Sequence, residues 1–374
     1  MDWREPIPWF AVPPRDRDRR ADADPRRDGS ARPDPERDAM RRALALGERV
    51  RGRTSPNPPV GAVILAANGS LVGQGATRPP GGPHAEVVAL ADAGRKARGG
   101  TAVVTLEPCA HTGRTGPCVE ALLAAGIVRV VYAVDDPNPV AAGGADRLRA
   151  AGVDVVAGVA RRQAADGALR PWLHALATGR PFVTWKFAAT LDGRVAAADG
   201  SARWISGAGS RADAHALRAI VDAILVGSGT VLADDPRLTA RDANGRLVAR
   251  QPLRVVLDRR HRVPQSAAVL DRAAETLLLD TAAPRFALKA LHDRGARHVL
   301  LEGGPTLAGA FVEARCVDEV VAYLAPKLLG AGLSALAGAG VATIDEAVKL
   351  DVRQVARIGG DVKIVGPLVW PEKE

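Results

Sequence analysis

Short apolar runs alternate with helical patterns along most of the chain, and this alternation constrains the fold more than any other feature of the sequence. Two runs, VGAVILA and LVGQGAT, flank the turn dipeptide Asn68-Gly69, which predicts an antiparallel β-hairpin. Helices and strands are then expected in turn, beginning with a helix, at 84–93, 101–106, 118–125, 128–134, 145–151 and 153–156. This order predicts a three-layer α/β/α domain.

A second alternation begins near Arg180 and predicts a second α/β domain. Its expected strands share a run of consecutive apolar residues: FVTWKFAA, AILVG, RVVLD, TLLLD, HVLLEGG, EVVAYLAP and VKIVG. We therefore predict domains at 37–160 and 180–374, joined by a helical linker at 161–179.

The N-terminal segment differs from both domains. Residues 1–36 are rich in Pro, Arg and Asp and lack apolar periodicity, so they cannot bury enough surface to offset their ordering entropy. We predict that they form a disordered tail. A helical pattern begins at Met40 and is expected to stop before Ser55, because three prolines follow within the next four residues.

Composition and charge exclude some classes of protein. The chain has no run of about eighteen or more uncharged apolar residues, and its N-terminus carries Pro and Asp where a signal peptide needs an apolar core. We therefore expect a cytoplasmic protein without a membrane span. A net charge of +9 suits nucleic acid, but arginines are spread among acidic residues and only six Trp, two Tyr and five Phe could stack on bases. Nucleic acid is not an expected partner.

Three side chains in the first domain have the chemistry of zinc ligands: His84, Cys109 and Cys118. Catalytic zinc takes three protein ligands, commonly His nitrogen and Cys thiolate, and leaves one position open. Three cysteines are a small and odd number, which makes a disulfide framework an unsuitable explanation. Cys109 and Cys118, which lie close together in the sequence, are better explained as metal ligands. Pro83 and Pro117 mark two helix starts, which favour anionic groups such as a metal-bound thiolate. The sequence therefore predicts a zinc site.

Glu86 is the expected catalytic residue beside this zinc. It follows His84 by two residues, which on a helix separates the two side chains by roughly 200°, so Glu86 is expected near the reacting water and not as a ligand. An H-x-E motif followed by Pro-Cys is the signature of nucleobase deaminases. The alternative interpretation is that His84 caps a helix and that the cysteines are buried small side chains.

The spacing of the cysteines is unusual, since eight residues, AHTGRTGP, separate them. The segments PNPPVGAVI, GPHAEVVAL, TLEPCAHTGRTGPC and AAGIVRVVYAVDDPNP resemble the deaminase domain of the bifunctional riboflavin-biosynthesis deaminase/reductase family. GRPFVTWKFAATLDGRVA, DAILVGSGTVLADDPRLTAR and LLEGGPTLAGAF are similar to its reductase domain. The resemblance covers about residue 38 to the C-terminus. It implies a cytidine-deaminase-like α/β/α domain followed by a dihydrofolate-reductase-like α/β domain.

The resemblance implies two successive steps on one pyrimidine. Zinc-dependent hydrolysis would remove the exocyclic amine of diaminohydroxyphosphoribosylaminopyrimidine, and NADPH would then reduce 5-amino-6-(5-phosphoribosylamino)uracil to the ribityl product. The expected cofactors are Zn²⁺ and NADPH, the expected partner is the phosphoribosyl pyrimidine, and the expected assembly is a homo-oligomer. The alternative is a zinc deaminase for another nucleobase with a non-catalytic C-terminal binding domain.

The family match also implies contacts in both sites. Expected cofactor contacts are Ala188, Trp204, Thr230, Asp234, Gly304, Pro305, Thr306, Leu307, Ala308, Gly309 and Ala310. Expected substrate contacts are Asn57, Arg218, Leu238, Arg241 and Glu302, and Lys186 also matches the family. Ala202 stands where the family has a Ser, which removes one expected hydrogen bond. The loop before Pro305 follows a strand and opens a helix, so its backbone can approach a phosphate, but it is not the G-x-G-x-x-G of a Rossmann domain.

Overall fold

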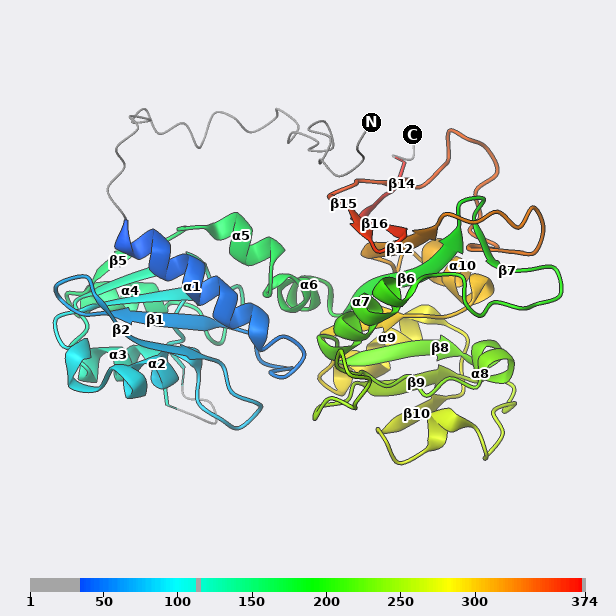
Figure 1. The fold of residues 1–374 in the computed structure, drawn as a ribbon. Coiled ribbons are helices and arrows are strands. Elements are labelled where there is room, and N and C mark those ends of the chain that lie inside the picture. Colours follow the sequence, from blue (N-terminus) through cyan, green and yellow to red (C-terminus); the bar gives the residue numbers. More distant parts are fainter. Residues whose placement is uncertain (1–33, 112–115, 372–374) are drawn as a thin grey trace, which may run out of the picture. The chain divides into compact units, whose positions relative to one another are not determined.

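The computed structural model describes residues 34–111 and 116–371, in which two large α/β sheets carry the expected elements (Figure 1). Within these residues no helix is both long and apolar enough to cross a membrane. The first helix, α1 (Pro35–Arg49), begins at Pro35 and not at Met40. Proline suits the first turn of a helix, and Glu36 and Asp38 there interact favourably with the helix dipole. The predicted tail thus overlaps α1 at Pro35 and Glu36, and residues 1–33 lie outside the described part of the chain.

The first sheet has the strand order β2-β1-β3-β4-β5. Its strands are β1 (Gly61–Leu65), β2 (Leu71–Ala76), β3 (Thr101–Leu106), β4 (Arg129–Val134) and β5 (Asp154–Val156). β1 pairs antiparallel with both β2 and β3, as the predicted hairpin requires, whereas β3, β4 and β5 are parallel. Every residue of β1 is buried, because helices cover both faces of the sheet.

Two glycines let helices approach this sheet closely from opposite faces. A Cβ on Gly61 would meet the carbonyl oxygen of Ala43 in α1 at 1.9 Å. A Cβ on Gly75 would meet the carbonyl oxygen of Ala85 in α2 (Ala85–Ala93) at 2.6 Å. Gly75 pairs with Ala62, and successive residues of a strand point to opposite faces, so α1 and α2 lie on different faces. The predicted three-layer arrangement follows from this packing.

The other helices of the first half are short. They are η2 (Gly94–Ala97), α3 (Cys118–Ala124), α4 (Gly144–Ala150), α5 (Arg161–Asp166) and α6 (Arg170–Thr178). The linker expected to be one helical stretch is two helices, α5 and α6, because α5 ends at Gly167.

The second sheet has the strand order β10-β9-β8-β11-β6-β12-β16-β15. Its strands are β6 (Phe182–Thr190), β8 (Ala223–Gly227), β9 (Leu253–Leu257), β10 (Thr276–Leu279), β11 (His298–Leu301), β12 (Glu319–Ala325), β15 (Gln354–Ile358) and β16 (Asp361–Gly366). The strands from β10 to β12 in this order are parallel, and β16 and β15 complete the sheet antiparallel.

The edge strand β15 and two small strand pairs were not predicted. The pairs are β7 (Arg194–Ala196) with β13 (Leu333–Ser334), and β14 (Lys349–Leu350) with β17 (Leu368–Val369). None of these strands contains a long apolar run, because four of them have only two or three residues and β15 is mostly exposed.

Neighbouring residues of β8 face two different cores. Leu225 packs with Leu288 of α9 (Pro284–Asp293) and Phe311 of α10 (Pro305–Glu313) in one core. Ile224 packs in the other core, with Val231 of α8 (Ser228–Asp234) and against Leu217 of α7 (Ala208–Ala219). Helices therefore cover both faces, and the carboxyl ends of the parallel strands are left open for ligands.

Candidate active sites

Three side chains that can bind metal converge where α2 and α3 begin. His84 directly precedes α2, and Cys118 is the first residue of α3. His84 Nδ1 lies 3.2 Å from Cys118 Sγ and 3.6 Å from Cys109 Sγ, and the ligand atoms of all three residues lie within 4.8 Å of one another. The backbone N–H of Cys118 donates to Cys109 Sγ at 3.4 Å. The structure thus brings the three predicted metal ligands together.

The two thiols of this cluster ionise unequally in the absence of a metal. The hydrogen bond from Cys118 lowers the pKa of Cys109 to about 4, against the opposing effect of burial. The same hydrogen bond and burial raise the pKa of Cys118. One thiolate is therefore already stabilised. A nitrogen and two buried sulfurs form a donor set that fits zinc, which holds its cysteine ligands as thiolates.

A cavity of about 450 Å³ lies beside the cluster, and His84, Cys109, Glu86 and Asn57 line it. Glu86 is buried, and burial raises the pKa of its carboxyl group. A carboxyl group with a raised pKa is suited to accept and return a proton near neutral pH. The cavity has the size of a typical small-molecule site.

Asp136 and Asn138 line the same cavity, although the sequence analysis did not assign them. Both follow the carboxyl end of β4. The backbone N–H of Asp136 donates to Glu107 Oε2 at 3.1 Å, and burial, with a contribution from Glu107, raises the pKa of Asp136 to about 6. Their position after a parallel strand is the sequence signal that could have found them, since ligands bind at that edge of an α/β sheet.

A second cavity, of about 690 Å³, lies at the carboxyl ends of strands in the second sheet. The predicted residues that line it are Ala188, Thr230, Asp234, Glu302, Gly304, Pro305, Thr306, Leu307 and Ala310. Gly304 caps α10, and its backbone N–H donates to Thr230 Oγ1 at 3.2 Å. The two predicted loops, at 227–230 and 303–306, therefore meet at one site. The first of them opens the short helix α8.

A buried carboxylate, Glu302, lines this cavity and holds two cations. Arg218 donates to both of its oxygens, from Nε at 2.6 Å and from Nη2 at 2.9 Å, and Lys186 Nζ lies 3.6 Å from Oε2. Burial alone would raise the pKa of Glu302, but Arg218 and Lys186 lower it to about 2. Glu302 is thus ionised at neutral pH and fixes the position of Lys186, which also lines the cavity.

Comparison with known proteins decides the family. The model of the cytidine and deoxycytidylate deaminase zinc-binding region matches residues 33–134, and that of the RibD C-terminal domain matches residues 181–364. Riboflavin biosynthesis protein RibD of Mycobacterium tuberculosis strain H37Rv is 53% identical over 325 residues, which cover 87% of this chain and 95% of that protein. The chain belongs to the RibD family.

Solved RibD structures agree with this assignment. Acinetobacter baumannii RibD is 37% identical with a TM-score of 0.81, and the match covers 90% of this chain and 99% of that one. A Thermotoga maritima protein, described as a diaminohydroxyphosphoribosylaminopyrimidine deaminase/5-amino-6-(5-phosphoribosylamino)uracil reductase, is 32% identical with a TM-score of 0.83 and the same coverage.

RibD membership confirms the predicted fold class and the resemblance on which it rested. The protein is an enzyme of riboflavin biosynthesis with a deaminase and a reductase domain. The alternative of a non-catalytic C-terminal domain is wrong, because the RibD reductase domain occupies that half of the chain. The two domains point to zinc and to a nicotinamide cofactor.

Six of the predicted contact residues do not line the second cavity of this RibD-family enzyme: Trp204, Arg218, Leu238, Arg241, Ala308 and Gly309. Trp204 is 64% exposed, with the guanidinium of Arg211 4.4 Å from its ring centroid. Gly309 packs so closely that a Cβ there would lie 1.7 Å from the carbonyl oxygen of Ala337. The contacts predicted for these residues stay predictions.

Proposed function

We propose that the first domain hydrolyses the exocyclic amine of diaminohydroxyphosphoribosylaminopyrimidine and that the second reduces the resulting 5-amino-6-(5-phosphoribosylamino)uracil to its ribityl form. The observation that carries the proposal is the cluster of His84, Cys109 and Cys118, which lies at a cavity that His84, Cys109 and Glu86 line. The Thermotoga maritima relative is described as a deaminase and a reductase of these same two compounds. The proposed domains span 37–160 and 180–374.

In the proposed deaminase, His84, Cys109 and Cys118 hold Zn²⁺. When bound, the ion would act as a Lewis acid and lower the pKa of a water molecule, which would make that water a nucleophile near neutral pH. Glu86 accepts the proton of the attacking water and delivers it to the amine at the same carbon. A carbon–oxygen bond forms, the carbon–nitrogen bond breaks, and ammonia leaves.

In the proposed reductase, the second cavity binds NADPH, whose nicotinamide supplies the hydride. The eleven cofactor contacts predicted from the sequence, of which Ala188 is the first and Ala310 the last, are proposed to bind NADPH. We propose that Glu302, Arg218, Leu238 and Arg241 contact the phosphoribosyl substrate. Glu302 holds Lys186 in place at the cavity wall, where its side-chain nitrogen can donate to an oxygen of the sugar.

Three arginines support NADPH over NADH. Arg259, Arg260 and Arg262 follow β9 and line the second cavity, although the sequence analysis did not single them out. An Arg cluster is suited to the additional phosphate of NADPH. Replacing Arg259 and Arg260 by Gln is expected to raise the KM for NADPH by about 10- to 100-fold and to leave the KM for NADH nearly unchanged. Steady-state kinetics with both cofactors measure this, with Arg246→Gln as a control outside the cavity. Equal changes for NADPH and NADH would contradict the proposed role.

The proposed activities are tested by two separate readouts. A zinc-loaded sample given the diaminopyrimidine substrate is expected to release ammonia, and the same sample given the deaminated intermediate is expected to oxidise NADPH. Absence of ammonia release would refute the proposed deaminase, and absence of NADPH oxidation would refute the proposed reductase. The expected homo-oligomer, the absence of nucleic acid and the cytoplasmic location remain predictions. Light scattering after gel filtration measures the first of them.

Glu86→Gln separates the proton carrier from the metal ligands. We expect deamination to fall by about 100- to 10,000-fold, because general acid–base catalysis contributes that much, while bound zinc is unchanged. Ammonia release and metal content of the purified variant are the two measurements. Loss of zinc from Glu86→Gln would instead make Glu86 part of the metal site.

A further inference from the structure

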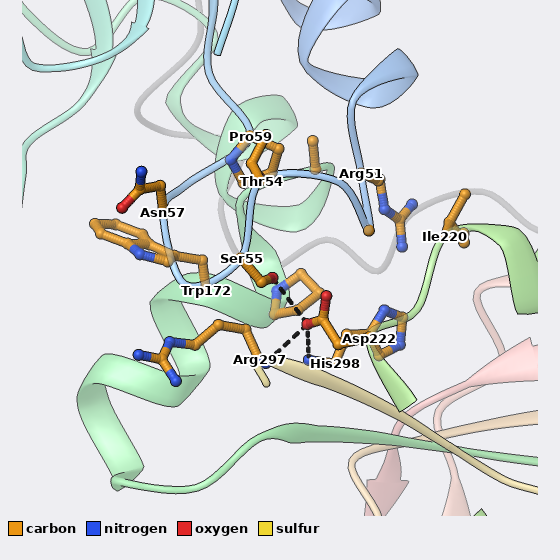
Figure 2. A pocket seen from close by; sticks show the side chains of 13 residues that line it. Arg51, Thr54, Ser55, Asn57, Pro59, Trp172, Ile220, Asp222, Arg297 and His298 are labelled. Atoms are coloured by element: carbon orange, nitrogen blue, oxygen red, sulfur yellow. Dashed lines mark hydrogen bonds between the residues drawn. The ribbon is translucent and has the colours of Figure 1, made fainter. Parts of the chain in front are cut away.

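Arg297 belongs to the reductase half of the chain, in the turn between α9 and β11, yet it lines the deaminase cavity. The same wall of the cavity contains Trp172 of α6 and the loop residue Asn57. Figure 2 shows the Arg297 side chain extending away from Asp222, on the side where Asn57 and Trp172 lie. The guanidinium therefore belongs to a wall that also carries a predicted substrate contact.

A shared carboxylate fixes Arg297 to the loop that carries Asn57. Asp222 Oδ2 accepts from the backbone N–H of Arg297 at 2.8 Å, from that of His298 at 3.0 Å, and from Ser55 Oγ at 2.8 Å (Figure 2). Gly295 packs beside the same loop, since a Cβ there would lie 3.5 Å from Pro56 Cδ. The turn at 295–298 and the loop at 55–57 are thus held together.

The guanidinium of Arg297 is only partly satisfied. Nη1 donates to the carbonyl oxygens of His292 at 3.2 Å and Ala296 at 3.1 Å, whereas the buried Nε has no hydrogen-bond partner. Within the described ranges no carboxylate forms an ion pair with it, and burial lowers its pKa more than the charge of Asp222 raises it. A half-buried cation without a counter-ion is costly, and an anionic ligand would remove that cost.

Acidic side chains line the rest of the cavity wall that the structure describes. Glu86, Glu107 and Asp136 line it, and a phosphate placed among these acidic groups would be repelled. Among the lining residues that the structure describes, Arg297 is the only Lys or Arg. Among the described lining residues, Arg297 is therefore the arginine that a phosphorylated substrate can pair with.

We propose that Arg297 is a substrate-binding residue of the deaminase cavity and pairs with the phosphate of the phosphoribosyl group. The proposal rests on the proposed deaminase function and names the residue by which it selects a phosphorylated substrate. A planar guanidinium matches phosphate geometry with two parallel hydrogen bonds, and a desolvated site strengthens the pairing. The reductase half would thereby complete the binding site of the deaminase half.

The test compares the phosphorylated pyrimidine with the same riboside lacking phosphate. Arg297→Gln is expected to raise the KM for the phosphorylated substrate about 10- to 100-fold, with kcat nearly unchanged, and to leave the KM for the riboside unaltered. Arg297→Lys keeps the charge without the planar group and is expected to give an intermediate KM. Arg294→Gln, an exposed position three residues earlier, is the matched control and should behave as wild type.

NADPH oxidation with supplied deaminated intermediate is measured on the same samples and should not change in Arg297→Gln, which shows that the variant is folded. An equal rise in KM for both compounds, or no rise for either, would overturn the role of Arg297. An Arg297→Lys variant as impaired as Arg297→Gln but with normal riboside kinetics would still support a geometric phosphate contact. Wild-type protein that releases no ammonia would instead refute the proposed deaminase function itself.

Discussion

Cys118→Ala is expected to remove zinc from the protein and to lower deamination by about 1,000-fold or more, while NADPH oxidation with supplied deaminated intermediate continues. The variant deletes one of the three proposed ligands, whose ligand atoms lie within 4.8 Å of one another. A Lewis acid stabilises the charge of the transition state by several kcal/mol, and a loss of that stabilisation slows the reaction by about 1,000-fold or more. Metal analysis and the two activity assays on one preparation measure the result.

Cys316→Ala is the matched control, because Cys316 is also a buried free cysteine but lies in the second domain, outside the cluster. It should keep its zinc and its ammonia release. Stoichiometric zinc in a folded Cys118→Ala sample would show that the ligand set is different. Loss of both activities in a folded sample would contradict two independent sites.

Glu302→Gln is expected to lower the free energy of unfolding by about 3–5 kcal/mol and to abolish reduction, because it leaves the cations of Arg218 and Lys186 without their buried counter-charge. The lowered pKa of Glu302 agrees with this size. A shift from 4.5 to about 2 corresponds to about 3 kcal/mol of stabilisation by the ionised form. Urea unfolding at neutral pH measures the difference between wild type and variant.

The pH dependence of that difference has a definite sign. A carboxyl group whose pKa is lower in the folded state stabilises the protein above its unfolded pKa, and the contribution is lost as the pH falls through the folded pKa. The difference in free energy of unfolding between wild type and Glu302→Gln should therefore be largest above about pH 5 and should decrease between about pH 4.5 and 2. A difference that stays constant over this range would show that the charge of Glu302 is not its source.

A double replacement controls for the loss of packing. Replacing Arg218 and Glu302 together by Leu removes both main partners, and it should cost less than the sum of the two single changes, since a buried ion pair can often be exchanged for apolar side chains. Additive effects would mean that Arg218 and Glu302 do not interact in solution.

Many helices and strands could be predicted from the sequence, because apolar runs and proline positions coincide with buried strands and helix starts. The apolar run at 101–106 is β3 with the expected bounds, and the starts of α2 and α3 lie where Pro83 and Pro117 indicated them. The edge strand β15 was missed, because its residues are mostly exposed and lack an apolar run. Local pattern is informative where a segment carries an apolar run and weak where a strand is mostly exposed and lacks one.

The candidate sites divide in a similar way. His84, Cys109 and Cys118 could be grouped from motif and element order, because each stands next to a helix or strand end. Arg297 could not, since it joins the deaminase cavity through contacts of Asp222 with a loop far away in sequence. Pairings of this kind depend on tertiary packing, which single-sequence patterns do not encode.

The hydrogen bonds of Asp222 affect whether the deaminase domain could be separated from the reductase domain. A deaminase cut free before Pro181 would retain every proposed zinc ligand, Glu86 and Asn57, but Ser55 would lose its acceptor and the wall of the cavity would lose Arg297. The boundary between the two catalytic modules, drawn along the chain, is therefore not the boundary between their working parts. Fusion of the two enzymes into one polypeptide would therefore serve the structure of the first active site.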